Sequence, residues 1–460
     1  MNADSTKRKR PGARRDRMQV APASDPVEKP ELRGAQVYLP DTRTLVYALK
    51  YAEGLRYLTS DRRLLTKEEA ERHFIITTGP SRRTKFSRAA ALAFQRNGTA
   101  PQPAELFARV VRLFREHVYW PSPHTPVLLA LWVMGTYVFQ VFTYFPYIAL
   151  NSADKRSGKS LVEEIMSEVA FNATAPMVGV TAATIYRDIH FNDSTLILDE
   201  VETLREGDKA IRAATLAVLC AGFKKGGTVP RCEPQANGAY AAPSEYSAYS
   251  PKMFAGINEV AAVIRDRSIS ILMERKPKGV QCQRFNVTAL APELRALRDD
   301  LHAFGLASAT AIARAYMQHA QLVLPELDDR GRDIFEPLAA VAHIVGAEAE
   351  RALCAAVAEI ASQRRADDAS TEGELETARA VLIEQLGESE SIVLRSDDAL
   401  TAFQKAGLSG MDRAADAQAM LRRLGFRSGT HRCAVRGPQR GYKITRAELL
   451  SRDDPGERAA

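Results

Sequence analysis

The chain has 460 residues, of which 45% are hydrophobic and 26% are charged, and this composition is typical of a soluble globular protein with at least two domains. The formal net charge is +7, but residues 1–17 hold seven basic and two acidic side chains, so five of those charges belong to the N-terminal tail. The remainder is nearly neutral, and charge alone therefore does not indicate a nucleic-acid-binding protein. Five cysteines without a C-x-x-C pair argue against a disulfide framework and favour a cytoplasmic location.

Composition and periodicity divide the chain into seven segments. In chain order we expect a disordered basic tail (1–32), a small N-terminal region of unassigned role (33–100), an α/β core (101–286), a helical extension (287–363), a polar linker (364–376), a small C-terminal domain (377–448) and a disordered tail (449–460). The basic tail reads either as a solvated arm or as a non-specific phosphate contact. No apolar run follows its charges, so no secretory signal is predicted.

Residues 126–150 are apolar enough to suggest a membrane span. Phe145-Pro146 interrupts the run, and the segment after it, YIALN, reads as a short strand. A buried helix followed by a buried central strand gives the same hydropathy, so we expect that arrangement and no membrane partner.

From residue 146 onward, strand-like and helix-like segments alternate, which predicts a parallel sheet covered by helices on both faces. The expected strands are 147–151, 176–180, 194–200, 252–258 and 268–274, and the expected helices are 159–170, 182–190 and 209–222.

The first of these strands leads into SADKRSGKS at residues 152–160, which resembles the phosphate loop G-x-x-x-x-G-K-[ST] except that Ala153 replaces the first glycine. In that motif the backbone N–H groups surround phosphates, the lysine reaches the β and γ phosphates, and the hydroxyl binds Mg²⁺. The following helix would point its N-terminus at the phosphates. The predicted ATP-binding residues are Ser157, Gly158, Lys159, Ser160 and Leu161.

The segment TLILDE places Asp199 and Glu200 at the end of a buried strand. We expect Asp199 to hold Mg²⁺ together with Ser160, and Glu200 to orient and polarise the attacking water. Taken alone, the two acids would read as a helix cap after a core strand. They lie about forty residues after the lysine of the loop and in the same predicted sheet, and this position favours a catalytic site.

Three further residues complete the predicted catalytic set. Asn258 ends the strand KMFAGIN, where a polar side chain would touch the γ-phosphate or the water. Arg265 and Arg267 stand directly before the strand SISILME, where ring ATPases present an arginine to the neighbouring subunit. The alternative is a pair of surface arginines that pair with Asp266 or Glu274. Arg267 is the favoured donor.

Several motifs in this order resemble those of an ATPase family long described as a domain of unknown function, which occurs in plasmid, phage and prophage proteins of the primase–helicase type. The motifs are PSPHTPVLLALWVMGTY, YIALNSADKRSGKS, LILDE, FKKGGTVPRC, KMFAGIN, IRDRS and RGY, and they extend over residues 103–448. The resemblance implies a divergent AAA+ or superfamily-three-helicase-like P-loop fold with a winged-helix-like C-terminal domain. It also implies ATP and Mg²⁺ as cofactors, a homo-oligomer, DNA as a partner and a primase as a further candidate partner. Nothing in the first 100 residues resembles a primase core, so polymerase activity is not implied.

Two regions are candidates for contact with DNA, most simply single-stranded DNA. Residues 223–250 contain the turn signal Asn237-Gly238 and lie where superfamily-three-like ATPases carry a DNA-gripping hairpin, although their prolines argue against a long regular one. A polar surface loop is the alternative. The C-terminal domain combines two helices with a basic strand pair, which suits either phosphate contact or packing between subunits. The candidate phosphate contacts are Lys224, Lys225, Arg231, Arg422, Arg423, Arg432 and Lys443, and the candidate stacking residues are Tyr240, Tyr246 and Tyr249.

Three functions remain open on the sequence. The first is a DNA-stimulated, helicase-like ATPase of a mobile element. The second is a regulatory ATPase whose nucleotide switches DNA or partner binding without unwinding. The third, a scaffold that binds ATP without hydrolysing it, is disfavoured by the intact pair Asp199 and Glu200.

Overall fold

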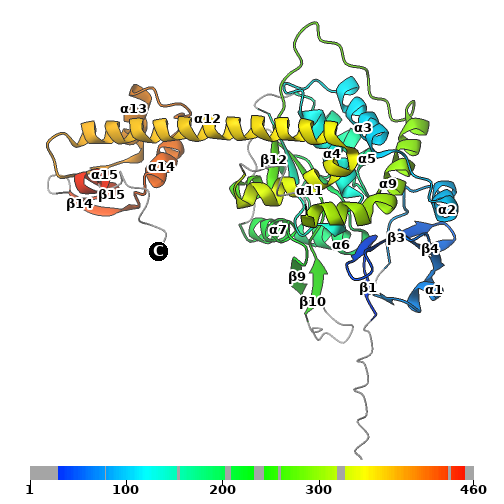
Figure 1. The fold of residues 1–460 in the computed structure, drawn as a ribbon. Coiled ribbons are helices and arrows are strands. Elements are labelled where there is room, and N and C mark those ends of the chain that lie inside the picture. The colour runs from blue at the N-terminus through cyan, green and yellow to red at the C-terminus, as the bar shows by residue number, and fades with distance from the viewer. Residues whose placement is uncertain are drawn as a thin grey trace, which may run out of the picture. The chain divides into compact units, whose positions relative to one another are not determined.

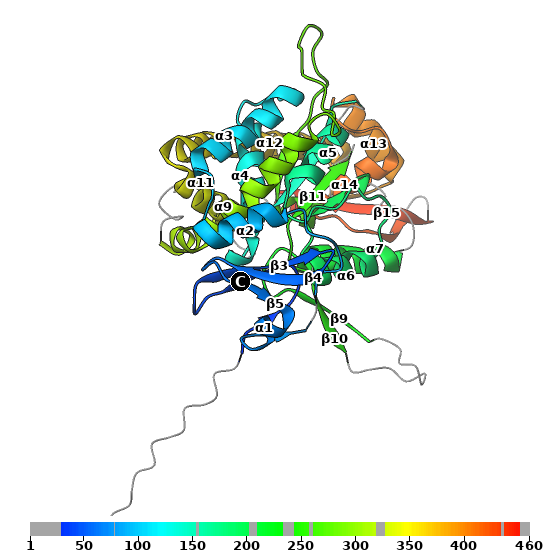
Figure 2. The same ribbon diagram turned by 90° about the vertical axis from the view of Figure 1, so that its right-hand side faces the viewer.

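The computed structural model describes residues 29–77, 79–152, 156–201, 209–232, 243–256, 261–318, 327–433 and 437–450, without the side chains of 364–370 and 432–439. The chain forms two compact units that divide after Leu353. The first unit contains a parallel sheet with its helices and a separate antiparallel sheet (Figures 1 and 2).

Four parallel strands form the central sheet in the order β12-β7-β11-β8. They are β7 (Tyr147–Asn151), β8 (Leu196–Leu198), β11 (Lys252–Gly256) and β12 (Ser268–Leu272). Tyr147 pairs with Ser268 and Asn151 with Leu272, so β7 and β12 are in register over their whole length. Since all four strands run in one direction, their last residues meet at one edge of the sheet, here called the carboxyl edge, and their first residues meet at the opposite, amino edge.

The predicted mixed α/β class with a parallel sheet is confirmed. Each of the four strands falls inside a segment expected to be a strand. The fifth expected strand, 176–180, is reduced to a single parallel bridge in which Met177 pairs with Leu198 of β8. Met177 therefore lies on the far side of β8 from β11.

Helices surround this sheet and join its strands. They are α3 (Pro103–His117), α4 (Thr125–Thr136), η1 (Phe139–Val141), α5 (Lys159–Val169), α6 (Ala182–Asn192), α7 (Lys209–Ala221), α8 (Ala262–Arg265), α9 (Ala291–Gln318) and α11 (Asp329–Val345). Every residue of α4 is buried, and the Trp132 indole N–H donates to the Pro146 carbonyl over 2.8 Å. The apolar run at 126–150 is thus a twelve-residue buried helix followed by a central strand. Among the described helices, none is long and apolar enough to cross a membrane.

Residues 29–97, most of which the sequence left without an assigned role, contain a separate antiparallel sheet. Its order is β2-β3-β4-β5, and β1 pairs with β6 beside it. The elements are β1 (Glu31–Leu32), β2 (Gln36–Leu39), β3 (Thr44–Tyr51), β4 (Gly54–Thr59), β5 (Leu64–Thr66), α1 (Lys67–Glu71), β6 (Ile75–Ile76) and α2 (Arg88–Asn97). Residues 31–32, which were expected to belong to a disordered tail, are therefore part of a strand.

The end of α6 attaches this N-terminal sheet to the α/β core. The Asp193 carboxylate accepts hydrogen bonds from the backbone N–H groups of Ala35, over 2.6 Å, and Gln36, over 2.9 Å. Gly34 adopts φ 72°, and a Cβ there would lie 2.1 Å from the Asp193 Oδ2, so only glycine fits. Burial raises the pKa of Asp193 to about 7, although these hydrogen bonds oppose the shift.

A short antiparallel pair, β9 (Thr228–Arg231) and β10 (Ser244–Ser247), follows α7 in the chain and projects from the core (Figures 1 and 2). Its tip, including Asn237 and Gly238, lies outside the described residues.

The second unit holds most of α12 and six further elements. The helix α12 spans Ala347–Leu386, and the six elements after it are β13 (Ser391–Leu394), α13 (Ser396–Lys405), α14 (Ala414–Arg423), β14 (Ser428–Cys433), β15 (Gly437–Thr445) and α15 (Arg446–Leu450). Its core includes Phe403, Leu421 and Ile444. The two predicted helices and the strand pair are present, and β13 adds a third strand beside β15. The segment 364–376, expected to be a polar linker, is helical and lies inside α12, and residues 449–450 of the expected tail belong to α15.

Candidate functional site

The loop between β7 and α5 brings Ser152 and Lys159 together at the carboxyl edge. The Lys159 ammonium donates to the Ser152 hydroxyl, whose residue is only 2% exposed. Gly158 adopts φ 94° and serves as the N-cap of α5 without a side-chain cap, so glycine's freedom at positive φ is needed there. Ser160 and Leu161 follow in the first turn of α5, and Ser160 is exposed. The lysine and the hydroxyl thus lie at the N-terminus of a helix that begins from a central strand. Ala153 lies outside the described residues.

The Ser157 hydroxyl is an orphaned polar group in this loop. The residue is 6% exposed, and its Oγ has no hydrogen-bond partner among the described residues. A buried hydroxyl without a partner costs free energy, roughly 1–3 kcal/mol. The donor set of this loop, with a helix N-terminus, an ammonium and an unsatisfied hydroxyl, therefore fits an anionic ligand such as a phosphate chain.

Asp199 and Glu200 follow β8 at the same edge. Asp199 is half-buried, and its backbone N–H donates to the Met177 carbonyl over 3.0 Å. Glu200 adopts φ 51°, and its own N–H donates to the Asp199 Oδ1 over 2.7 Å. This conformation is uncommon for a residue with a Cβ. It turns the chain sharply after β8 and leaves the Glu200 side chain exposed.

Glu163 is a member of the site that sequence reasoning missed. It is fully buried on α5, and within the described part of the chain neither carboxylate oxygen has a hydrogen-bond partner. Burial and the Asp199 carboxylate raise its pKa to about 8, and Lys159 acts in the opposite direction. The signal was present in the sequence, because an acid three residues after Ser160 lies on the same helix face.

The connections that follow β7 and β11 diverge at the carboxyl edge, where this loop lies. After β7 the chain passes through α5 to Met177, beyond β8, whereas after β11 it passes through α8 to β12, on the other side of β7. The connections that follow two neighbouring strands thus leave in opposite directions. In open parallel sheets, ligands bind outside the carboxyl ends of the strands at such a switch point.

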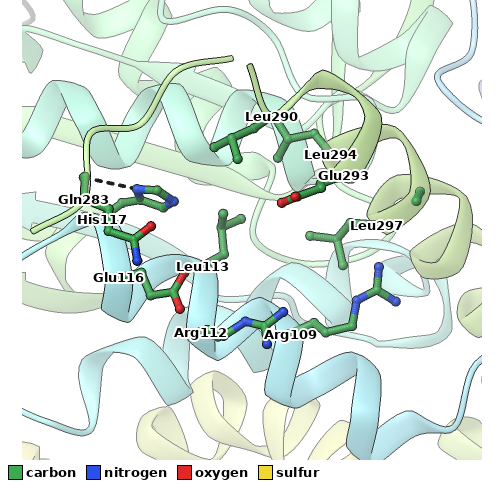
Figure 3. A pocket seen from close by; sticks show the side chains of 11 residues that line it. Arg109, Arg112, Leu113, Glu116, His117, Gln283, Leu290, Glu293, Leu294 and Leu297 are labelled. Atoms are coloured by element: carbon green, nitrogen blue, oxygen red, sulfur yellow. Dashed lines mark hydrogen bonds between the residues drawn. The ribbon is translucent and has the colours of Figure 1, made fainter. Parts of the chain in front are cut away.

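A cavity of about 480 Å³ opens between α3 and the start of α9 (Figure 3). Its lining residue His117 directly precedes Val118 in the chain, and a Cβ on Gly158 of the loop would lie 4.0 Å from Val118 Cγ1. The lining combines leucines with charged and polar groups. The lining residues are Arg109, Arg112, Leu113, Glu116, His117, Gln283, Leu290, Glu293, Leu294, Ala296 and Leu297. Apolar walls with a few polar groups are typical of small-molecule sites.

Charged residues suited to a divalent cation are few here. The described residues contain no cluster of three or more His, Cys, Asp or Glu that would hold a metal ion. Mg²⁺ is commonly held by one or two protein ligands, with phosphates and water as the others. Ser160 and Asp199 fit that pattern, together with the orphaned carboxylate of Glu163.

The two predicted arginines lie at the amino edge, away from the loop. Arg267 precedes β12, and one of its N–H groups donates to the Val263 carbonyl over 2.6 Å. Its guanidinium lies 6.0 Å from the centre of the Phe223 ring, and its side chain is 23% exposed. Arg265, at the end of α8, is exposed. The third predicted residue, Asn258, lies outside the described residues.

The candidate DNA contacts around β9 are engaged within the chain. The Lys224 ammonium lies 5.5 Å from the Tyr144 ring centre, and Lys225 donates to the Gln140 carbonyl over 2.5 Å. The Arg231 guanidinium lies 5.2 Å from the Tyr186 ring centre. These cations still reach the surface at one end, because Lys224 and Lys225 are exposed and Arg231 is half-buried.

The tyrosines expected to stack on bases do not serve that role. Tyr246 is 7% exposed and packs against Tyr186 and His190. Tyr249 is 1% exposed, and its hydroxyl donates to the Phe139 and Phe142 carbonyls. That prediction was wrong for these two residues because their rings complete the core, and Tyr240 lies outside the described residues.

In the second unit, Arg422, Arg423 and Lys443 are exposed, as a contact with phosphates requires. The side chain of Arg432 lies outside the described part. The lining of a cavity of about 440 Å³ includes three arginines: Arg395, which is the N-cap of α13, Arg422 on α14 and Arg440 on β15.

Comparisons with known proteins add a family match and likenesses to solved structures. A family model described as "Protein of unknown function (DUF3631)" matches residues 272–451. The match includes the C-terminal unit and leaves the β7–α5 loop and β8 outside it. A solved structure described as "The A form apo structure of NrS-1 C terminal region-CTR" is similar with a TM-score of 0.31 and 9% sequence identity, over 81% of this chain and 80% of that one. A search of curated proteins gave no match.

Proposed function

We propose that this chain is a Mg²⁺-dependent ATPase whose site lies at the carboxyl edge of the parallel sheet. One observation carries the proposal. A helix N-terminus with Lys159 and an orphaned buried Ser157 hydroxyl follows β7, and Asp199 follows β8 at the same edge, with β11 between the two strands. A chain of phosphates matches these donors, and a P-loop fold of the AAA+ type accounts for this strand order.

Each side chain has a role in this proposal. Lys159 binds the β and γ phosphates, and the backbone N–H groups of 157–161 surround them. Ser160 and Asp199 hold Mg²⁺, which supplies positive charge against the phosphates when bound. Glu200, exposed beside Asp199, orients and polarises the attacking water.

The cavity between α3 and α9 would take the adenosine half of the nucleotide. Leu113 on α3 and Leu294 and Leu297 on α9 give apolar contacts for a planar base (Figure 3). Glu116 and Glu293 offer acceptors for an exocyclic amino group. Adenine has such a group, so the lining favours ATP.

Further features support an oligomeric, DNA-stimulated motor of a mobile element. Arg265 and Arg267 lie at the amino edge, where only a neighbouring subunit's phosphates would meet them. Three arginines converge on one cavity of the C-terminal unit, which suits a phosphodiester backbone. The helix pair α13 and α14 and the hairpin β14–β15 fit a winged-helix-like fold for this unit. The alternative is an ATP-switched protein that binds DNA or a partner without unwinding.

Phosphate release from ATP, measured with and without Mg²⁺ and single-stranded DNA, tests this proposal. We expect Mg²⁺-dependent hydrolysis that rises with DNA. Hydrolysis without strand displacement on a forked duplex would favour the switch over the motor, and no hydrolysis under any condition would refute both.

A further inference from the structure

Glu163 is a buried acid that the proposed hydrolysis does not use. Its residue is 0% exposed, and both carboxylate oxygens lack a hydrogen-bond partner within the described structure. An ionisable group in this state is costly. It shares the inner face of α5 with Val162, Ile165, Met166 and Val169. An apolar residue would satisfy that face at lower cost, so packing alone does not account for a carboxylate.

The surroundings of Glu163 indicate what the carboxylate faces. Among the described residues, the charges of Asp199 and Lys159 act on the pKa of Glu163, and these are residues assigned to the metal and to the phosphates. Ser160, the other assigned metal ligand, lies three residues earlier on the same helix, and side chains with that spacing share a face. Glu163 is therefore buried within one turn of the exposed Ser160 and is near enough to Asp199 for that carboxylate to raise its pKa.

We propose that Glu163 is a positioning residue for the Mg²⁺ of this site and accepts hydrogen bonds from metal-bound water. The inference rests on the proposed function and adds a residue to it. Mg²⁺ gives up its waters reluctantly, so its protein contacts commonly include acceptors that bind those waters. Such outer contacts fix the orientation of the direct ligands, and their loss typically lowers metal affinity ~10–100-fold.

The test measures Mg²⁺ affinity without relying on turnover. A fluorescent ADP analogue is bound to the full-length protein, and MgCl₂ is titrated to find the midpoint of the Mg²⁺-dependent change. The variants are Glu163→Gln, which keeps the shape, and Glu163→Leu, which removes the polar group. Glu164→Gln is the matched control, because Glu164 is the next residue on α5 and is exposed. Nucleotide affinity in EDTA and the thermal midpoint are measured in parallel.

We expect both Glu163 variants to raise the Mg²⁺ midpoint ~10-fold or more, with EDTA affinity unchanged and Glu164→Gln like wild type. A purely structural role would change the thermal midpoint and leave the Mg²⁺ midpoint where it is, and that result would overturn the inference. If Glu163→Leu does not fold, Glu163→Gln decides alone. If wild-type protein binds no nucleotide, the proposed function and this inference both fail. If wild-type protein binds the nucleotide in a Mg²⁺-dependent way and the Glu163 variants have the same Mg²⁺ midpoint, only the inference is refuted.

Discussion

Arg267 and Lys159 lie at opposite edges of the same parallel sheet. The Arg267 carbonyl accepts from the Tyr147 N–H, at the first residue of β7, over 3.0 Å, whereas Lys159 begins the helix that follows the last residue of that strand. Four residue steps along β7 amount to ~13 Å. An arginine at the amino edge is thus remote from the phosphate site of its own chain, and a catalytic role for it requires a second subunit.

This separation predicts rescue between two inactive variants. Arg267→Ala and Lys159→Ala should each lose activity alone, because one lacks the donated guanidinium, typically worth ~10³–10⁵ in rate, and the other the phosphate-binding lysine. Mixed at high concentration, they should recover part of it, since some interfaces pair an intact loop with an intact arginine. The same mixture with Arg265→Ala tests the more exposed donor. Activity independent of protein concentration, without rescue in either mixture, would refute a shared site.

Glu200→Gln should keep ATP binding and lose turnover. The amide preserves the shape of the side chain at this left-handed position and loses the charge that polarises water. Affinity for ATP is measured by equilibrium binding and turnover by phosphate release. Weakened Mg²⁺-dependent binding together with residual turnover would instead assign Glu200 to the metal.

Leu113→Trp should fill the cavity between α3 and α9 and weaken ATP binding about 10-fold or more, since the indole would occupy the space of the base. Inorganic tripolyphosphate, which has no base, is the control ligand and should bind as it does to wild type. Equal losses for both ligands would show that the substitution disturbs the loop, and no loss for ATP would remove the cavity from the nucleotide site.

Asp193→Asn should make the stability of the protein less sensitive to pH. The pKa of Asp193 is raised to about 7 in the folded chain by burial, while an unfolded aspartate titrates near 3.9. Between about pH 4 and 7 the folded state holds more protons, so its stability falls as the pH rises, by a few kcal/mol at most. Asparagine tolerates the positive φ of 46°.

Urea unfolding at pH 5 and pH 8 measures this effect. Wild type should lose more unfolding free energy between the two values than Asp193→Asn, and Asp41→Asn, at an exposed turn, should behave like wild type. Parallel losses in all three proteins would show that Asp193 is not held with a raised pKa.

The parallel sheet could be predicted from the sequence because its strands are short apolar runs between helices. YIALN, LIL, KMFAG and SISIL all appear as strands of one sheet. The antiparallel sheet at residues 36–66 was mostly missed, since its longest strand, TLVYALKY, is buried along most of its length and shows little alternation of polar and apolar residues. The helix through 364–376 was also missed, because residues of low helix propensity such as Asp367, Ser370 and Gly373, without an apolar face, are typical of a linker.

In the candidate site, too, some residues could be predicted from the sequence and others could not. Motif spacing located Lys159, Ser160, Asp199 and Glu200, which the chain brings to one edge. Glu163 was missed because a single acid in an amphipathic helix usually faces solvent. The burial of Tyr246 and Tyr249 depends on contacts with residues more than fifty positions away, and no local pattern reports such contacts.

The most direct test of the account is the rate of Mg²⁺-dependent ATP hydrolysis by Lys159→Ala beside wild type. Lys67→Ala is the matched control, since Lys67 is an exposed lysine on α1, in a surface ion pair with Glu71 at 3.7 Å. We expect Lys159→Ala to lose at least about 100-fold in rate, as removal of a group that stabilises transition-state charge typically does, and Lys67→Ala to match wild type. Hydrolysis by Lys159→Ala at the wild-type rate would contradict the assignment of this site.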